Sequence, residues 1–327
     1  MFCINNQNIN PYFNLASEEY LLKNFEEEIF MLWRDEPSII IGKHQNALAE
    51  INIDYVKENQ IKVVRRLTGG GAVFHDLGNL NFTFISNSPN GKVVMDFEKY
   101  TRPIVDVLIS LGIDAHFEGR NDIVIDGKKI SGNAECVYRN RVLHHGTILY
   151  SAHLPNLSSA LKVNPLKFQD KAVKSTRNRV ANISDYLKKP MEVVQFRDLI
   201  FTHIAQMYAD SKIYEFTTED IAFITNLQKG KYETWEWNFG NSPEYNFRKI
   251  VKTSGGFIEF DLMVEKGIIT SAKIFGDFFS SNEISEIETA LKGLRHEYNV
   301  VKQKLEGYAI ERYFNRATLD EVLEGIF

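Results

Sequence analysis

Two segments of the chain repeat their apolar residues at helical spacing. The first, FNLASEEYLLKNF, runs from Phe13 to Phe25, and either Asn14 or Ser17 can cap its start. The second, FEKYTRPIVDVLISL, runs from Phe97 to Leu111, with Pro103 close to its first turn. Both segments are predicted as amphipathic helices that pack one face against a core.

The other apolar runs between residues 30 and 150 are short and predict β-strands. IFMLWR and SIIIGKHQN are separated by the turn-like DEPS, which predicts two neighbouring strands. In NLNFTFIS, apolar and polar residues alternate, which predicts a strand with one polar face. DIVIDGKKISG predicts a hairpin around Asp126-Gly127. IKVVRRL and HHGTILYSAHL predict further strands.

Short turns join most of these predicted strands, and few helices separate them. A doubly wound parallel sheet would need a helix after nearly every strand. The pattern therefore predicts an α/β (α+β) fold with a mixed or antiparallel sheet flanked by helices.

The pattern changes beyond Lys249. GGFIEFDLMVEKGIITSAKIFGDF predicts a hairpin that turns at Glu265-Lys266-Gly267, and helices are predicted at 282–295 and from Thr318. The run GNSPEYNFRK, which precedes this unit, is rich in turn formers. We therefore predict two domains, at 1–247 and 253–327, joined by a linker at about 248–252.

Composition excludes several classes of protein. The 327 residues carry a net charge of −5, so the chain has no global electrostatic footprint for nucleic acid. Two cysteines, Cys3 and Cys136, are too few for a disulfide scaffold and indicate a cytoplasmic protein. No run approaches the roughly 20 apolar residues that a membrane span needs, so neither membrane insertion nor secretion is expected.

The stretch RRLTGGGAVFHD, Arg65 to Asp76, places three glycines between two arginines and a His-Asp pair. Such glycines let the backbone turn at positive φ and bring N–H groups close to a ligand, so the loop can cradle a phosphate. It matches neither the P-loop nor the dinucleotide fingerprint, and a flexible hairpin turn is the other interpretation. Because Arg65 and Arg66 alternate across a strand, one of them can point into the same cavity as the loop.

A second polar cluster is GRNDIVIDGKKISGNA, residues 119–134. Asn121 and Asp122 stand at the mouth of a predicted strand, and the hairpin return presents Lys128 and Lys129 on opposite faces. Alternation alone does not assign either lysine to the inside, and two solvated turn lysines are the simpler interpretation.

A third cluster holds Lys171, Lys174, Arg177 and Arg179 within nine residues. Such a run is usually a solvated face. A basic loop that closes on an anion fits it equally well, and periodicity does not decide between the two.

Taken together, these segments resemble the lipoate-protein ligase family. RRLTGGGAVFHDLGN, residues 65–79, fits the family signature R-R-x-[ST]-G-G-G-A-V-[FY]-H-D-x-G-N. GRNDIVIDGKKISGNA is similar to the second motif, HHGTILY to the third, and KSTRNRVAN to the loop that contacts the adenylate. The resemblance covers residues 14–186 in detail, and the chain length is similar to that of the two-domain bacterial form. It implies the biotin/lipoate ligase fold, which is like that of class II synthetases.

The resemblance implies a reaction in two steps. Lipoate and MgATP first give lipoyl-adenylate and pyrophosphate. The lipoyl group then passes to a lysine of a carrier domain, in the E2 subunits of 2-oxoacid dehydrogenases or in the glycine cleavage H protein. The C-terminal domain would be an accessory domain that helps adenylate formation and reorients between the steps.

The resemblance also implies roles for individual residues. Lys129 would contact both the lipoate carboxylate and the α-phosphate and stabilise the charge that develops there. Asp122 is the candidate ligand of Mg²⁺. The implied ATP-binding residues are Arg66, Gly71, Ala72, Val73, Phe74, Asn121, Asp122, Lys129 and Arg179. The implied lipoate-binding residues are Trp33, Thr68, Gly69, Gly70, Gly71, His75, Lys129, His145, Gly146 and Thr147.

Three alternatives differ in chemistry. A carrier-to-carrier transferase would move an octanoyl or lipoyl group through a cysteine thioester without ATP, but Cys136 fits a buried structural residue better. A biotin-ligase-like activity is disfavoured because the first motif resembles the lipoate branch. A non-catalytic lipoate-binding protein would have no need of Arg66, Lys129 and the glycines together.

Overall fold

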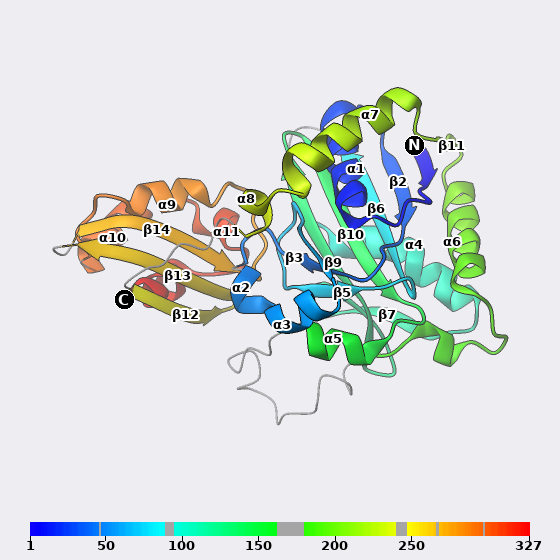
Figure 1. The fold of residues 1–327 in the computed structure, drawn as a ribbon. Coiled ribbons are helices and arrows are strands. Elements are labelled where there is room, and N and C mark those ends of the chain that lie inside the picture. Colours follow the sequence, from blue (N-terminus) through cyan, green and yellow to red (C-terminus); the bar gives the residue numbers. More distant parts are fainter. Residues whose placement is uncertain (46, 89–94, 162–179, 240–246, 266–267, 297) are drawn as a thin grey trace.

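The computed structural model of the chain describes residues 1–327 except 46, 89–94, 162–179, 240–246, 266–267 and 297. The N-terminal part, coloured from blue to yellow-green, forms a large lobe, and the C-terminal part, from yellow to red, forms a smaller lobe beside it (Figure 1). Within the described residues, no helix is both long enough and apolar enough to cross a membrane.

The large lobe is built on an eight-stranded sheet. Its strands are β1 (Phe2–Asn5), β2 (Ile29–Trp33), β6 (Asn79–Asn87), β7 (Ala115–Glu118), β8 (Asp122–Ile125), β9 (Lys128–Tyr138), β10 (Arg141–Leu149) and β11 (Lys212–Ile213). They lie in the order β11-β1-β2-β6-β10-β9-β8-β7. β1 is parallel to β2 and β11, and the other pairs are antiparallel. The predicted mixed, largely antiparallel sheet is therefore confirmed.

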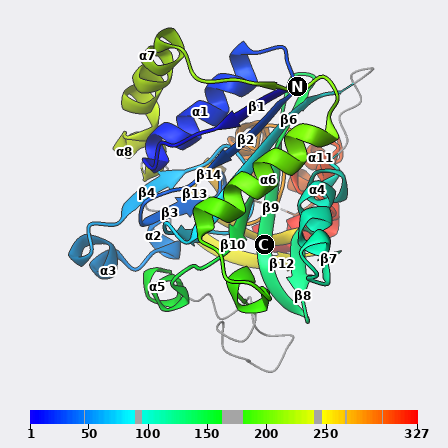
Figure 2. The same ribbon diagram turned by 90° about the vertical axis from the view of Figure 1, so that its right-hand side faces the viewer.

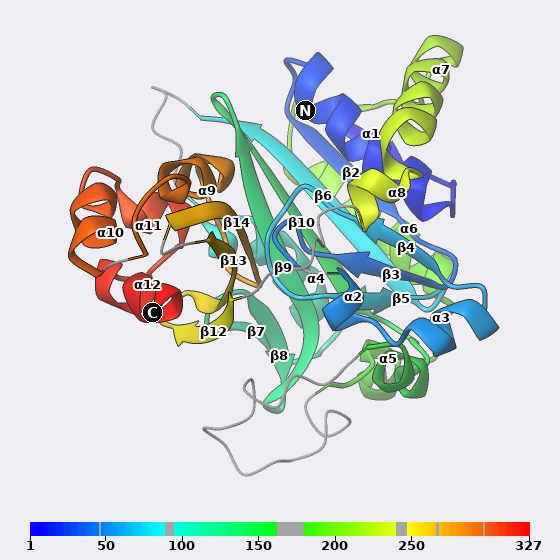
Figure 3. The same cartoon turned by 60° about the vertical axis from the view of Figure 1, so that its left-hand side comes forward.

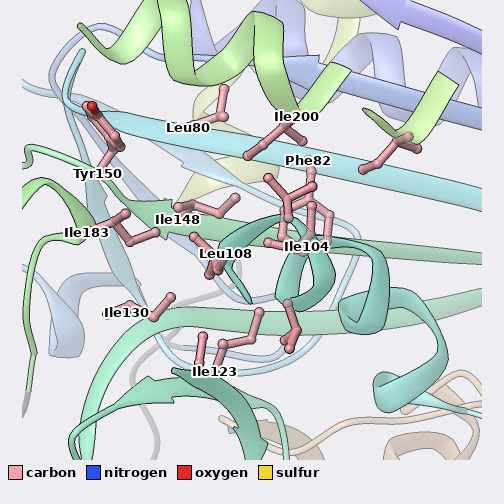
Figure 4. Packing of buried hydrophobic residues seen from close by; sticks show 14 of the residues in the cluster. Leu80, Phe82, Ile104, Leu108, Ile123, Ile130, Ile148, Tyr150, Ile183 and Ile200 are labelled. Carbon is pink, nitrogen blue, oxygen red and sulfur yellow. The ribbon is translucent and has the colours of Figure 1, made fainter. Parts of the chain in front are cut away.

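One face of this sheet carries the main hydrophobic core. Helices α4 (Phe97–Ser110) and α6 (Val193–Met207) cover it and contribute residues such as Ile104 and Ile200 (Figures 2 and 4). Leu80 and Phe82 of β6 reach the same core. Each buried side chain of this size contributes about 1.5–3 kcal/mol to stability.

The polar residues of β6 lie on its other face, because side chains alternate along a strand. Asn81 and Thr83 are buried there rather than exposed. The predicted polar face of this strand is thus confirmed, and it points into the protein.

A three-stranded sheet covers part of this second face, together with helix α1 (Pro11–Asn24) (Figure 3). Its strands are β3 (Ser38–Ile41), β4 (Lys62–Arg65) and β5 (Val73–His75), with β3 between the other two. The short helices α2 (Ala47–Glu50), α3 (Ile53–Glu58) and α5 (Leu154–Ala160) accompany it.

The prediction that β2 and β3 are neighbours is wrong, since they belong to different sheets. Both strands are buried on both faces, so hydrophobicity does not reveal which strands they pair with.

Two helix details also differ from the prediction. The side chain of Asn10 caps α1, while Asn14 lies inside the helix, fully buried. Ser17 instead donates its hydroxyl to the carbonyl of Phe13 at 2.8 Å. Pro103 lies inside α4, which begins at Phe97 and is capped by Asp96. Pro11 stands at N1 of α1, two residues before the predicted start at Phe13, which explains why the helix begins there.

The remaining elements of the large lobe lie before and after α6 in the sequence. They are the 3₁₀ turn η4 (Ile183–Tyr186), which precedes α6, then α7 (Thr218–Leu227), the π-helical turn η5 (Gln228–Tyr232) and α8 (Trp235–Asn238). α7 and η5 pack on α1, and α8 contacts β4.

The small lobe contains a second three-stranded sheet with its own core. Its strands are β12 (Phe247–Thr253), β13 (Gly256–Glu265) and β14 (Ile268–Gly276), and its helices are α9 (Ser285–Leu291), α10 (Tyr298–Leu305), α11 (Ile310–Tyr313) and α12 (Leu319–Ile326). The predicted hairpin is present as β13 and β14, although Lys266 and Gly267 of its turn lie outside the described residues. The helix predicted at 282–295 is shorter, and the one predicted from Thr318 is capped by that residue.

The segment predicted as a linker, 248–252, is part of strand β12. The turn formers that suggested a linker lie mainly before it, at 240–246, outside the described residues. Val251 belongs to the core of the small lobe. The division into two domains remains a proposal, with its boundary moved to before Phe247.

Candidate active site

A cavity of about 350 Å³ lies between the two sheets of the large lobe and the part of the small lobe that follows β14. This is near the lower limit of ligand pockets, which range over roughly 300–1,000 Å³. Its walls come from α1, both sheets, the glycine segment and Asp277 of the small lobe.

Strand pairing places five residues in one row across the floor of this cavity. Asp122 of β8 pairs with Gly132 of β9, and Gly132 pairs with Thr147 of β10. Thr147 pairs with Asn81 of β6, which pairs with Trp33 of β2. Directly paired residues share a face, and neighbouring strands lie about 4.8 Å apart, so three spacings separate Asp122 from Asn81 by roughly 14 Å. The cavity therefore has a long axis that crosses the sheet.

The two ends of this axis differ in character. The charged end is lined by Arg120, Asn121, Asp122, Lys129 and Asp277. The buried end is lined by Leu15, Trp33, Ile40, Val73, His75 and Asn81. A long ligand with one charged and one apolar terminus would match this polarity.

At the charged end, Lys129 Nζ lies 2.7 Å from Asp122 Oδ1. The two side chains are 38% and 35% exposed, so both are open to a ligand and to water. Lys128 is exposed and does not line the cavity. The lining of the cavity thus resolves the ambiguity between the two lysines that alternation leaves open.

Two backbone features fix the position of Lys129. Gly132 gives it room, because a Cβ at that position would lie 2.8 Å from Lys129 Nζ. Val180 pairs with Lys129 in a parallel bridge, and the N–H of Ala181 donates to the Lys129 carbonyl at 3.0 Å. The chain that follows the basic cluster therefore runs beside the charged end.

The glycine segment packs too closely for side chains. Gly70 has a φ of +89°, and a Cβ on Gly42 would lie 2.0 Å from the Gly70 carbonyl oxygen. A Cβ on Gly69 would lie 2.2 Å from the carbonyl oxygen of Phe278. The segment is therefore a packed wall of the cavity, which argues against a flexible hairpin turn.

Arg66 holds this wall in shape. Its guanidinium donates to the Gly69 carbonyl at 2.6 Å, the Gly71 carbonyl at 2.9 Å and the Thr68 hydroxyl at 2.9 Å. Arg65 points elsewhere, to backbone carbonyls that include Gln45 at 2.6 Å. Burial lowers the pKa of each arginine to about 10, so both keep their charge at neutral pH. One arginine of the pair does line the cavity, as predicted, and it is Arg66.

His75 links the buried end to a carboxylate. Its Nδ1 lies 2.8 Å from Asp35 Oδ2, and its Nε2 lies 2.9 Å from the Thr147 hydroxyl. Asn14 donates its amide to the other oxygen of Asp35 at 2.9 Å. Burial raises the pKa of Asp35, while the hydrogen bonds from His75 and Asn14 act in the opposite direction.

His145 has an analogous arrangement. Its Nδ1 lies 2.9 Å from Glu18 Oε1, and its Nε2 lies 2.7 Å from the Thr68 hydroxyl. Glu18 also accepts from the Thr83 hydroxyl at 2.6 Å, and Thr83 accepts from the Trp33 indole at 2.9 Å. Two carboxylate–histidine–threonine chains thus brace the cavity wall, one from α1 and one from the loop after β2.

Most residues implied by the family resemblance line the cavity. They are Trp33, Arg66, Gly70, Gly71, Ala72, Val73, His75, Asn121, Asp122, Lys129, His145, Gly146 and Thr147. Thr68 and Gly69 lie behind the wall, and Phe74 packs into a separate apolar cluster with Ile39 and Ile41. Arg179 lies outside the described residues.

The site residues missed from the sequence include Glu18, Asp35, Asn81, Arg120 and Asp277. Glu18 carried a signal, since it interrupts the apolar face of a predicted helix and is 2% exposed. Asp35 sits in a segment that reads as a turn, and Asp277 follows a strand of the other lobe. Only tertiary structure brings these two to the cavity.

The small lobe contacts the glycine segment directly. The N–H of Gly70 donates to the carbonyl of Phe278 at 3.4 Å, and Phe278 stacks on His44 with ring centroids 4.8 Å apart. Arg120 donates to the carbonyl of Gly255 and lies over the ring of Phe279, 4.8 Å from its centroid. In this arrangement the small lobe completes the cavity.

Cys136 is poorly suited to nucleophilic catalysis. It lies on β9, packed against the core between the sheet and α1, and does not line the cavity. Burial raises the pKa of its thiol to about 12, so very little thiolate is present at neutral pH.

The fold, and a cavity with a lysine at its charged end, fit a ligase that acts on a carboxylic acid. The chain matches the model of the lipoyl protein ligase A/B catalytic domain over residues 10–205, and that of the bacterial lipoate protein ligase C-terminus over 242–326. The chain belongs to the lipoate-protein ligase family.

Individual relatives agree with this assignment. The lipoate-protein ligase LplJ of Bacillus subtilis is 44% identical over 100% of both chains. The crystal structure of LipL1 from Plasmodium falciparum in complex with lipoate is similar, with a TM-score of 0.83 and 26% identity, over 99% of this chain and 98% of that one. A lipoate-protein ligase A bound with ATP has a TM-score of 0.64 and 31% identity over 73% of this chain and 98% of its own.

Proposed function

We propose that this enzyme activates lipoate with ATP and transfers the lipoyl group to a lysine of an acceptor protein. In the first step, an oxygen of the lipoate carboxylate attacks the α-phosphorus of ATP, and pyrophosphate leaves. In the second, the acceptor ε-amine attacks the carbonyl carbon of lipoyl-AMP, AMP leaves and an amide forms. Activation is needed because a free carboxylate is a poor electrophile at neutral pH.

The observation that carries this proposal is the position of Lys129. Its ammonium stands at the charged end of a cavity whose other end is mostly apolar. A carboxylate bound there would place its acyl chain along the row from Gly132 to Trp33. Lys129 would hold the carboxylate oxygen near the α-phosphate and stabilise negative charge as it develops in both steps.

The glycine segment would supply the nucleotide contacts. Because Gly70 has no Cβ, a phosphate can closely approach the backbone N–H groups of Gly71 and Ala72. Arg66 would act mainly by keeping this segment in shape, because its donors are already bonded to loop carbonyls.

Asp122 and Asp277 are the carboxylates that line the described part of the cavity. Mg²⁺ is usually held by one or two carboxylates together with substrate phosphates, and these two residues fit that pattern. Bound there, Mg²⁺ would neutralise charge on the triphosphate.

The acceptor is the finer part of the proposal. The similar bipartite lipoate protein ligase of Thermoplasma acidophilum has an E2 lipoyl domain as its partner. We propose the lipoyl domains of E2 subunits and the glycine cleavage H protein as acceptors, and the cytoplasm as the compartment. The small lobe would act as the accessory domain in adenylate formation, because it forms part of the cavity wall.

The test is the intact mass of an apo lipoyl domain after incubation with enzyme, lipoate, Mg²⁺ and ATP. We expect a gain of one lipoyl group that requires ATP and falls about 100- to 1,000-fold in rate with Lys129→Ala. Lys128→Ala is the matched control, because this neighbouring lysine is exposed and should leave the rate unchanged. No gain from free lipoate, despite lipoate binding, would indicate a carrier-to-carrier transferase or a non-catalytic binding protein.

A further inference from the structure

Arg120 is a second cation at the charged end of the cavity, in the turn between β7 and β8. Its side chain is partly exposed and lines the cavity together with Lys129. Burial lowers the pKa of its guanidinium, and the nearby carboxylates of Asp277 and Asp122 act in the opposite direction. Arg120 therefore lies beside the two carboxylates that are proposed to hold Mg²⁺ with the triphosphate.

The small lobe holds the guanidinium of Arg120 in two ways. Its Nη1 donates to the carbonyl of Gly255. Its Cζ lies 4.8 Å from the centroid of the Phe279 ring, and that ring is fully buried against Phe97 of α4. Gly256 leaves room for the arginine, because a Cβ at that position would lie 3.2 Å from Nη1. These contacts restrict where the guanidinium can lie.

Most donors of this guanidinium are still available to a ligand. An arginine side chain carries five N–H donors in a fixed planar fork. Among the residues that the structure describes, the bond to Gly255 is the one hydrogen bond that the guanidinium makes. Its Nε and Nη2 are not among the buried atoms that lack a partner, so both are accessible. Such a fork binds phosphate through two parallel hydrogen bonds.

The two cations of the charged end occupy different places. Lys129 Nζ packs against Gly132 of the sheet and lies 2.7 Å from Asp122 Oδ1. Arg120 precedes Asp122 in the chain and packs against the small lobe instead. Adenylate formation also divides negative charge between two places, since the carboxylate and the α-phosphate stay together while pyrophosphate leaves. One cation is therefore available for each product.

We propose that Arg120 is a catalytic residue of the first step, which binds the β- and γ-phosphates of ATP and stabilises pyrophosphate as it leaves. When the carboxylate oxygen bonds to the α-phosphorus, the bond from that phosphorus to the bridging oxygen breaks. The electron pair stays on pyrophosphate, where the guanidinium stabilises the charge. The second step releases AMP and no pyrophosphate, so it does not require Arg120. This inference rests on the proposed function, because it assumes that ATP binds at the charged end.

The test measures the two steps separately with the full-length enzyme. The first is followed as pyrophosphate release from MgATP and lipoate in a single turnover, and the second as the mass gain of an apo lipoyl domain from added lipoyl-AMP. Arg120→Met keeps a long side chain and removes the charge. We expect it to slow pyrophosphate release about 100-fold and to leave transfer from lipoyl-AMP within about twofold. Arg102→Met, which removes an exposed arginine of α4, is the matched control and should change neither rate.

A purely structural role, in which Arg120 only fastens the small lobe, predicts a different pattern of binding. Calorimetry with inorganic pyrophosphate and with AMP, each with Mg²⁺, separates the two roles without any turnover. We expect Arg120→Met to weaken pyrophosphate binding about tenfold and AMP binding by less than about twofold. A fastening role would weaken both ligands alike. Should Arg120→Met fail to fold, Arg120→Lys keeps the charge without the planar fork, and we expect it to release pyrophosphate about tenfold more slowly than the unaltered enzyme.

An unchanged rate of pyrophosphate release in a folded Arg120→Met or Arg120→Lys enzyme would overturn the inference. Equal weakening of AMP and pyrophosphate, or equal slowing of the two steps, would do so as well. Failure of the proposed function gives a different result. In that case the unaltered enzyme releases no pyrophosphate from ATP and lipoate, whereas Arg120→Met still weakens pyrophosphate more than AMP.

Discussion

The charged and buried ends of the cavity are built on different physical principles. At the charged end, Lys129 and Asp122 form an ion pair that is about one third exposed. At the buried end, Asp35 and His75 form a hydrogen-bonded pair with side chains 0% and 3% exposed. The first arrangement can exchange partners with a ligand at little cost, whereas the second must stay intact for the wall to keep its shape.

This contrast separates residues for chemistry from residues for architecture. Lys129 and Asp122, the groups proposed to bind a carboxylate and phosphates, are accessible and lie on the hairpin of β8 and β9. Groups that shape the pocket are buried behind it and come from α1 and from the loop after β2. Substitutions at the two ends should therefore affect different measurements.

One substitution at each end of the cavity tests this division, and the largest expected effect is on the free energy of unfolding. Asp35→Asn replaces by NH2 one of the two oxygens that accept from His75 Nδ1 and Asn14 Nδ2, so one buried donor loses its acceptor and faces another donor. The free energy of unfolding should fall by about 2–4 kcal/mol. Asp122→Asn breaks a partly exposed pair and should lower it by less than about 1 kcal/mol. Denaturant unfolding of both variants measures the difference. Equal losses would mean that the two ends are not built differently.

The lysine and the glycine segment could be predicted from the sequence, whereas the buried carboxylates that hold His75 and His145 could not. The motifs around Arg66 and Lys129 are local runs whose spacing carries chemical meaning. Asp35 and Glu18 meet the histidines only through packing of α1 and the small sheet on β2, β6 and β10. The same limit explains the error over β2 and β3, because strand pairing is decided by long-range contacts.

A second test compares the buried end with a similar pair on the opposite face of the sheet. His144 and Glu135 pair across β10 and β9, fully buried, with His144 Nδ1 2.8 Å from Glu135 Oε1. Burial raises the pKa of Glu135 to about 8 and holds the pKa of His144 well below 6.5. The pair is thus neutral at pH 7, with the proton on Glu135.

The raised pKa of Glu135 and the lowered pKa of His144 determine how the stability of the protein changes with pH. From pH 4.5 to 6.5 the raised pKa of Glu135 and the lowered pKa of His144 act in opposite senses on stability. Of this pair, only Glu135 contributes between about pH 6.5 and 8, and there the folded state binds more protons than the unfolded one. Stability should therefore fall by up to about 2 kcal/mol over this window. Glu135→Gln should flatten the fall in urea unfolding, and a fall that persists would assign it to other groups.

A smaller effect on ligation is expected from a substitution that moves Lys129 at the charged end without altering any charge. A Cβ on Gly132 would lie 2.8 Å from Lys129 Nζ, and the flexible lysine can move aside. Gly132→Ala should therefore lower kcat for ligation about five- to tenfold while leaving stability within about 0.5 kcal/mol. Gly230→Ala is the control, since a Cβ there meets nothing within 4 Å. A large loss of stability instead would show that Gly132 belongs to the architecture.

The smallest effect is expected at Cys136. It lies on β9, two residues beyond cavity-lining Ala134 and on the same face, yet it packs against the apolar core near α1. A thiol with a pKa of about 12 supplies almost no nucleophile at neutral pH, so Cys136→Ala should keep the ligation rate within about twofold. The loss of a partly buried sulfur should cost about 1 kcal/mol of stability. Abolished ligation in a variant that unfolds at the normal denaturant concentration would mean that the acyl group passes through a thioester, and the role assigned to the charged end would then be wrong.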